Sequence, residues 1–160
     1  MKIEILSKLK NIRLFLFDLE GVLLFKNDDE NIFISEIQKA VTEFINRDLI
    51  FGIISAREED SLIKKLKEIN GCNVLASSLE KVKAADILLR KFSIEYKNVF
   101  YMGDEVIDIP LMQKCSLAVA PKIAKREVKR NATYITNALS TGELFEEIFS
   151  LIDKSKKVFS

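Results

Sequence analysis

Two apolar runs of this 160-residue chain, at residues 13–18 and 98–102, each lead into a group of acidic side chains. These are Asp18, which ends the first run, with Glu20 two positions on, and Asp104, Glu105 and Asp108 after the second run. Two such groups at neighbouring strand ends would repel each other strongly unless a cation lay between them. An all-oxygen site that also holds water favours magnesium. The pattern therefore predicts a bound Mg²⁺.

Both acidic groups also allow a purely structural interpretation. Asp18 could cap the turn that Gly21 permits, and Asp108 could cap the helix expected after it. Apolar runs rarely end in a pair of carboxylates such as Asp18 and Glu20, so we favour a site with a chemical role there.

A third apolar run, residues 49–55, ends in Ser55, Ala56 and Arg57. A hydroxyl group together with backbone N–H groups at a helix N-terminus can hold a phosphate oxygen. Taken alone, Ser55 is as well explained as the N-cap of that helix. Its position at a third strand end is what makes it a candidate binding residue.

The composition excludes several kinds of chemistry. The chain has no histidine, which removes Ser-His-Asp and Cys-His catalysis and every histidine-containing metal site. Cys72 and Cys115 are too far apart in the sequence for a C-x-x-C pair, and free thiols fit a reducing compartment. The net charge of +1 implies no general attraction to nucleic acid or membranes.

The N-terminal apolar run, residues 14–17, is too short for a signal sequence or a membrane span, so we expect a cytoplasmic protein.

The apolar periodicity predicts strands that alternate with amphipathic helices. The expected strands are residues 13–18, 49–55, 98–102, 117–120 and 133–135, and the expected helices are residues 36–46, 58–70, 79–92, 122–129 and 142–154. This alternation predicts a Rossmann-like three-layer α/β/α fold with a mainly parallel sheet, whose ligands bind at the C-terminal ends of the strands. No linker interrupts the chain, so residues 1–160 are expected to form one domain without a separate cap.

One segment breaks the alternation. Residues 23–26 and 32–34 are apolar, and the polar residues 27–31 lie between them. This pattern predicts a small β-hairpin after the first strand.

Taken in order, Asp18-Leu19-Glu20, Ser55, a lysine and Gly103-Asp104 to Asp108 resemble the four motifs of the haloacid dehalogenase-like (HAD) phosphohydrolase superfamily. The segments DLEGVL, IISAR, EKVKAADILLRKF, YMGDEVIDIPLM and LAVAPKIAKREVKRNATYIT resemble its capless branch. That branch acts on 3-deoxy-manno-octulosonate 8-phosphate and related nonulosonate 9-phosphates. The resemblance spans residues 12–132.

The resemblance implies a mechanism. Asp18 would be the nucleophile that forms an aspartyl-phosphate, and Glu20 would protonate the leaving group and later activate water. Mg²⁺ would be held by the Asp18 carboxylate, the Glu20 backbone carbonyl and Asp104. Asp108 and Glu105 would lie around these ligands.

The resemblance also implies a phosphate-binding group. Ser55 and Ala56 would bind the transferring phosphoryl group, and a lysine would neutralise its charge. Lys81, Lys83 and Lys91 share one amphipathic segment, and alignment to the branch favours Lys81 over Lys83. A lysine at a helix start runs against the helix dipole, which also favours a functional role.

The chain departs from the branch at three places. Glu20 stands where most members have a second Asp, residues 34–37 replace an "RDG" segment, and residues 140–144 replace a glycine-rich motif that contains Arg. We therefore expect a Mg²⁺-dependent phosphatase for a small sugar-acid or sugar phosphate, with the substrate itself left open. The alternatives are a catalytically silent oligomerisation or interaction module and, disfavoured by the motif spacing, a phospho-accepting receiver domain.

Members of the branch form tetramers through their hairpins. An apolar contact of this kind could come from Leu23, Leu24, Phe25, Ile32, Phe33 and Ile34. We therefore expect a homotetramer.

Overall fold

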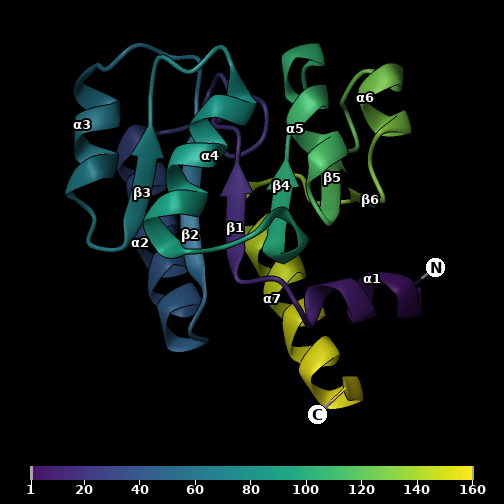
Figure 1. The fold of residues 1–160 in the computed structure, drawn as a ribbon. Helices are drawn as coiled ribbons and strands as arrows, with labels where there is room; N and C mark the ends of the chain where they lie inside the picture. The colour runs from purple at the N-terminus through teal and green to yellow at the C-terminus, as the bar shows by residue number, and fades with distance from the viewer. Residues whose placement is uncertain (1, 160) are drawn as a thin grey trace.

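The computed structural model describes residues 2–159, which form a parallel six-stranded sheet between two layers of helices (Figure 1). The strand order is β3-β2-β1-β4-β5-β6. The strands are β1 (Leu14–Phe17), β2 (Ile50–Ile54), β3 (Cys72–Leu75), β4 (Val99–Met102), β5 (Leu117–Pro121) and β6 (Tyr134–Thr136). The predicted α/β fold class is confirmed, and all the predicted strands except those of the hairpin are present.

The helices divide between the two faces of the sheet. One apolar core contains residues of α1 (Lys2–Leu9), α2 (Glu30–Asn46), α3 (Ser61–Glu68) and α7 (Thr141–Phe159). The other contains residues of α4 (Lys81–Phe92), α5 (Ile109–Lys114) and α6 (Arg126–Arg130). Short 3₁₀ helices cover Tyr96–Asn98 and Val106–Asp108.

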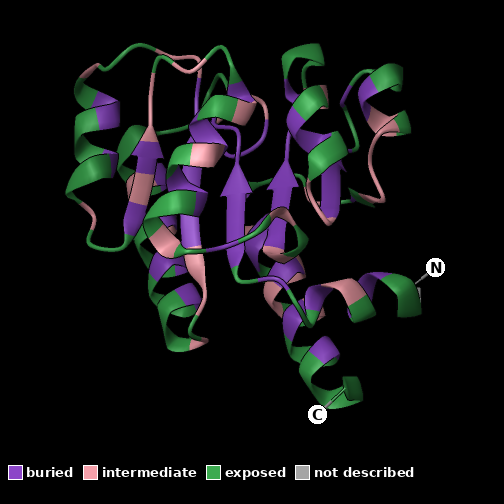
Figure 2. Ribbon diagram, viewed as in Figure 1, coloured by how far each residue is buried: buried purple, intermediate pink, exposed green. Residues whose placement is uncertain are grey.

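The central strands are buried on both faces, as Figure 2 shows. Successive side chains of a strand point to opposite faces, so Leu14 and Leu16 enter the core under α4 and α5. Phe15 and Phe17 enter the opposite core, where their rings lie 5.0 and 6.4 Å from the ring of Phe44 in α2. This double burial explains why β1 reads as a continuous apolar run rather than an alternating one.

The predicted β-hairpin is wrong, because residues 32–34 belong to α2. The Asp29 side chain caps this helix by accepting a hydrogen bond of 3.0 Å from the backbone N–H of Ile32. From there the buried positions follow helical spacing: Phe33, Ile37, Ala40, Val41 and Phe44. Residues 19–24 form a tight turn instead of a strand, with the backbone N–H groups of residues 23 and 24 donating to the carbonyl oxygen of Leu19.

The absence of the hairpin removes the surface on which we based the tetramer. Leu23 and Phe33 are buried inside the subunit, with exposed fractions of 0% and 2%, whereas Ile32 is 65% exposed. The six apolar residues therefore do not form one exposed strand pair.

Two elements were missed in the sequence. The edge strand β3 has only four residues and a mixed burial pattern, which gives a weak periodic signal. Helix α1 contacts α7, and this tertiary contact buries Ile5, Leu6 and Leu9. Within residues 2–159, no helix combines the length and apolar character needed to cross a bilayer.

The order of the strands brings distant segments together at one edge. The chain leaves β1 toward β2 and leaves β4 toward β5, yet β1 and β4 pair in parallel, with Phe17 opposite Met102. The backbone N–H of Asp18 donates to the carbonyl oxygen of Met102 at 2.9 Å. A crevice at such a reversal of strand order is where parallel α/β sheets bind ligands.

Candidate active site

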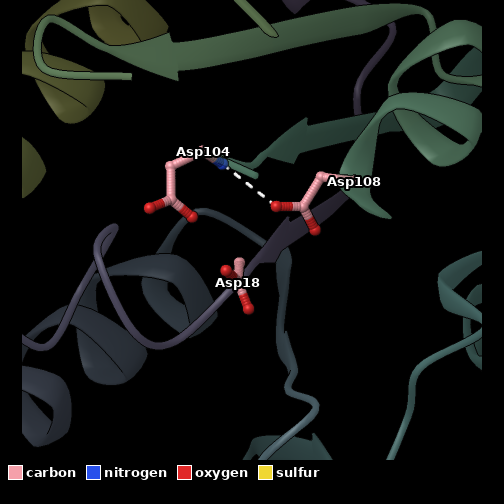
Figure 3. A group of neighbouring side chains, drawn as sticks. All are labelled: Asp18, Asp104 and Asp108. Carbon is pink, nitrogen blue, oxygen red and sulfur yellow. Dashed lines mark hydrogen bonds between the residues drawn. The ribbon is translucent and has the colours of Figure 1, made fainter. Parts of the chain in front are cut away.

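Three carboxylates meet at the C-terminal ends of β1 and β4 (Figure 3). Asp18 directly follows β1, Asp104 follows β4, and Asp108 ends the 3₁₀ helix after it. Each side chain offers one oxygen within 4.8 Å of the other two. Asp18 and Asp108 are buried, whereas Asp104 is half-buried. The fold therefore joins the two acidic groups that were separate in the sequence.

A buried lysine lies against this group. The Nζ atom of Lys81, at the start of α4, lies 2.9 Å from Asp18 Oδ1 and 3.4 Å from Asp108 Oδ1. It also donates to the carbonyl oxygen of Ile54 at 3.1 Å. Lys83 is exposed and pairs with Glu80, so Lys81 is the lysine that the fold brings to the carboxylates.

Asp108 is held by three donors. Its Oδ1 accepts a hydrogen bond of 2.5 Å from the hydroxyl of Tyr101, and its Oδ2 accepts from the backbone N–H groups of Asp104 and Glu105 at 3.0 Å each. Both oxygens are thus engaged within the protein, which leaves Asp18 and Asp104 as the side chains better placed to hold a metal. The expected capping of the helix after Asp108 is wrong, because its side chain makes no cap hydrogen bond to α5. The same bonds instead tie Asp108 to the start of the 3₁₀ helix in which it lies.

Two glycines permit the close approach of these side chains. Gly21 has φ of +82°, and a Cβ atom there would lie 2.0 Å from Asp104 Oδ2. A Cβ atom at Gly103 would lie 2.5 Å from the Cβ of Asp108. Side chains at either position would displace a carboxylate of the group.

The electrostatics of the group fit a divalent cation. Burial raises the pKa of Asp104 to about 8, with further contributions from a hydrogen bond to Asp18 and the charge of Asp18. Burial and the charge of Asp108 also raise the pKa of Asp18, against the opposing effect of Lys81. The buried Oδ1 of Asp104 has no hydrogen-bond partner among the described residues. A cation that accepts oxygen ligands would satisfy this atom and relieve the repulsion.

The side chain of Glu20 does not join the group. It is 62% exposed, and its Oε1 lies 3.3 Å from Nη1 of Arg57. Arg57 is held in turn by Asp60, with its Nε 2.7 Å from Asp60 Oδ2. Glu20 therefore lies at the rim of the site, at the mouth of an open cavity of about 550 Å³.

Ser55 is buried at the end of β2, where its Oγ accepts a hydrogen bond of 3.0 Å from the backbone N–H of Arg57. The next helix, α3, begins only at Ser61 and is capped by Asp60. The expectation that Ser55 adjoins a helix N-terminus is therefore wrong. Ala56 is half-buried beside it.

Glu105 lies outside the carboxylate group. Its side chain pairs with Lys125 at 2.8 Å and is half exposed. Its contact with the site runs through its backbone N–H, which donates to Asp108.

Sequence reasoning assigned no role to Tyr101 or Arg57. Tyr101 lies inside an apolar strand, and a buried tyrosine hydroxyl usually needs a hydrogen-bond partner. Its position in the sequence could therefore have indicated a buried polar partner near the end of this strand. Nothing in the spacing of Arg57 and Glu20 indicated that they would pair.

Known proteins resemble this chain in sequence and in fold. Residues 69–142 match the family described as haloacid dehalogenase-like hydrolase. The 3-deoxy-D-manno-octulosonate 8-phosphate phosphatase KdsC of Escherichia coli K12 is 26% identical over 156 residues, which cover 93% of this chain and 83% of that protein. The corresponding phosphatase of Yersinia pestis is 24% identical with the same coverage.

Solved structures show the same fold. The cobalt-bound deoxy-D-mannose-octulosonate 8-phosphate phosphatase of Haemophilus influenzae has a TM-score of 0.80 at 20% identity, covering 94% of this chain and 92% of that one. A phosphatase of Moraxella catarrhalis, solved with magnesium, phosphate and KDO, has a TM-score of 0.76 at 18% identity and covers 98% of both chains.

The fold, the motifs and the match over residues 69–142 support a phosphatase that is similar to hydrolases of the haloacid dehalogenase-like type. Within that type it is similar to the 3-deoxy-D-manno-octulosonate 8-phosphate phosphatases.

Proposed function

We propose that the chain hydrolyses a phosphate monoester of a small sugar or sugar acid in a Mg²⁺-dependent reaction, through an aspartyl-phosphate on Asp18. The observation that carries the proposal is the contact of 2.9 Å between Lys81 and Asp18 inside a group of three carboxylates. The Moraxella catarrhalis phosphatase, which shares the fold, was solved with magnesium and phosphate. The carboxylates of the present site favour a cation such as magnesium, and the charge of Lys81 favours an anion such as phosphate.

Asp18 and Asp104 would hold the ion, together with the backbone carbonyl of Glu20. Bound there, Mg²⁺ would neutralise the carboxylates and the charge that develops on the phosphoryl oxygens. The unpartnered Oδ1 of Asp104 and the raised pKa of its carboxyl support this assignment.

The first step would transfer the phosphoryl group to Asp18. A carboxylate oxygen of Asp18 attacks phosphorus, the bond from phosphorus to the ester oxygen breaks, and the leaving alkoxide takes a proton from Glu20. In the second step Glu20 takes a proton from water, which attacks phosphorus and releases inorganic phosphate. Asp18 is regenerated, and Glu20 is protonated again for the next cycle.

Lys81, Ser55 and Ala56 would bind the phosphoryl group. Lys81 brings a positive charge within hydrogen-bond distance of the nucleophile, where the phosphoryl oxygens would lie. Ser55 ends the neighbouring strand β2 and offers its hydroxyl group beside the backbone of Ala56. Glu105 and Asp108 would position the Asp104 turn through the hydrogen bonds that Asp108 accepts.

A single domain without a cap, a cytoplasmic location and a homotetramer remain predictions. Light scattering tests the last of these, and a monomer at micromolar concentration would contradict it.

The decisive experiment is a phosphate-release assay with Mg²⁺ over a panel of sugar phosphates and acetyl phosphate. Asp18→Asn should abolish turnover, and Glu20→Ala should lower it about 10²- to 10⁴-fold, the usual contribution of a general acid. The exposed Asp48→Asn and Glu68→Ala serve as matched controls and should keep the parent rate. Turnover that persists in Asp18→Asn would overturn the mechanism.

One observation favours the silent interaction module as a second candidate. The Glu20 side chain lies outside the carboxylate group and is paired with Arg57. If the parent protein turned over no substrate of the panel, acetyl phosphate included, this alternative would replace the enzyme.

A further inference from the structure

We infer that the open cavity beside Glu20 selects an uncharged, polyhydroxylated leaving group, such as a neutral sugar or polyol, over the carboxylate of a sugar acid. The inference rests on the proposed function and narrows the class of phosphate ester that this site takes.

The cavity is placed to receive the leaving group. It has a volume of about 550 Å³ and begins at Glu20 and Gly21, directly after the nucleophile. Gly21 is in close contact with Asp104, because only its missing Cβ leaves room for the Asp104 carboxylate. In the proposed first step the ester oxygen takes its proton from Glu20, so the leaving group would lie beside Glu20 and extend into this cavity.

Carboxylates outnumber cations in the cavity wall. The acidic lining residues are Glu20, Asp28 and Glu30, and the basic ones are Lys26 and Arg57. With Glu20 ionised in its pair with Arg57, the wall carries a formal charge of −1. When Glu20 holds the proton that it donates in the first step, the charge of the wall is zero, and Asp28 and Glu30 remain as its anions. A substrate that carries a carboxylate in addition to its phosphate would be repelled by the acidic side chains of the wall.

One of the two cations of the wall, Arg57, is already paired with carboxylates of the protein. Arg57 contacts Glu20 at 3.3 Å and Asp60 at 2.7 Å, so its guanidinium group is engaged with two protein carboxylates. A substrate carboxylate could use Arg57 only by displacing one of them. Lys26 is the remaining cation of the wall, and Lys65, which is not part of the wall, pairs with Glu30 at 3.1 Å.

The rest of the wall suits a sugar or polyol. Leu24, Phe25 and Leu62 supply apolar surface for the C–H groups of a carbon chain or ring. Ionised carboxylates accept hydrogen bonds but donate none, so Asp28 and Glu30 can bind hydroxyl groups and cannot bind another carboxylate. A polyol matches this wall, because its hydroxyl groups can donate to the carboxylates and its C–H groups can pack on the apolar side chains.

The experiment compares two probes that differ at one carbon. Glucitol 6-phosphate carries a hydroxymethyl group where 6-phosphogluconate carries a carboxylate. We expect kcat/KM to be at least about fivefold higher for glucitol 6-phosphate in Mg²⁺ at low salt, where unscreened charges act most strongly. An equal or higher value for 6-phosphogluconate would overturn the inference.

Variants that change only charge test the cause. Asp28→Asn keeps an acceptor for the backbone N–H of Phe25, to which Asp28 is bonded at 2.8 Å. Asp28→Asn and Glu30→Gln should each shift the ratio about two- to threefold toward 6-phosphogluconate, the size expected of one partly screened charge. Glu68→Gln removes an equal charge at the far end of α3 and should leave the ratio unchanged. An unchanged ratio in both cavity variants would contradict the electrostatic origin.

Acetyl phosphate separates this inference from the proposed function, because its leaving group is too small to probe the cavity wall. If acetyl phosphate is hydrolysed, the phosphatase stands and the two probes decide the inference by their rates. If it is not, calorimetric titration of the Mg²⁺-loaded protein with the two probes decides it. Tighter binding of glucitol 6-phosphate supports the inference, and equal or tighter binding of 6-phosphogluconate overturns it.

Discussion

The Nζ atom of Lys81 lies 2.9 Å from Asp18 Oδ1, and both side chains are buried. This contact joins the first turn of α4 to the end of β1, across 63 positions of the sequence. A buried charge is costly unless it is paired, so removal of either residue would leave the other as an uncompensated buried charge.

Replacement of Lys81 by Met should therefore damage both catalysis and folding. We expect kcat to fall about 10²- to 10³-fold, the usual cost of removing a charged donor from the transferring group. The free energy of unfolding should fall by about 3 kcal/mol, because Asp18 and Asp108 lose their cation. Steady-state kinetics and urea unfolding measure the two effects. Lys83→Met, on the exposed face of the same helix, should change neither, and an equal loss in that variant would contradict the assignment.

Gly21→Ala should displace the Asp104 carboxylate. The added Cβ would lie 2.0 Å from Asp104 Oδ2, at a backbone φ of +82° that disfavours side chains. We expect a loss of about 1–3 kcal/mol in stability and a higher Mg²⁺ concentration for half-maximal activity. Gly142→Ala is the control, since its Cβ would meet only the end of the Glu36 side chain at 3.3 Å. A Gly21→Ala variant with parental Mg²⁺ dependence would show that the contact is dispensable.

The metal-free protein should lose stability as the pH rises. The folded-state pKa of Asp104, about 8, is above the ordinary value of 3.8, so folding favours its protonated form. The resulting stabilisation is full below pH 3.8 and is lost as the pH approaches 8. In EDTA, the ionisation of Asp104 should lower the free energy of unfolding by about 1–3 kcal/mol between pH 5.5 and pH 8.

Asp104→Asn is the reference for that measurement, because the amide does not titrate. The difference in unfolding free energy between the parent and the variant isolates the Asp104 contribution from that of other groups. Mg²⁺ binds the ionised carboxylate, so its stabilising effect on the parent should grow over the same pH range. A difference between the two proteins that does not vary with pH would refute the prediction.

Tyr101→Phe should weaken the support of Asp108. The Tyr101 hydroxyl donates to Asp108 Oδ1 in a fully buried position, and Asp108 in turn holds the backbone of the Asp104 turn. Loss of this donor should cost about 1–3 kcal/mol of stability and lower kcat about tenfold. Tyr134 lies on β6, away from the site, and Tyr134→Phe removes a similar bond to Glu147 of α7. This variant should lower stability alone. If Tyr101→Phe also left kcat unchanged, the role of Tyr101 would be purely structural.

The strands other than β3 and the two acidic groups could be predicted from the sequence because their signals are local. A strand buried on both faces needs a continuous apolar run, and Asp18 and Asp104 come directly after such runs. Parallel strands end at the same edge of a sheet, so the pattern alone placed these carboxylates at one edge.

Other features depended on the packing of distant elements. Residues 32–34 have apolar side chains suited to either a strand or a helix, and burial of Phe33 and Ile37 against the sheet decided for the helix. The fold also decided that Tyr101 meets Asp108 and that Arg57 holds the longer side chain of Glu20 at the rim.

The sequence by itself therefore determined the α/β fold class, the strand ends that carry the carboxylates and the phosphatase class. The first two follow from residue type and short-range periodicity, and the phosphatase class follows from the resemblance of the motifs to a known superfamily. The tertiary structure decided which side chains bury their charges together, such as Lys81 with Asp18, and which remain exposed, such as Glu20. The reason is that the cost of burying a charge is set by partners far away in the chain.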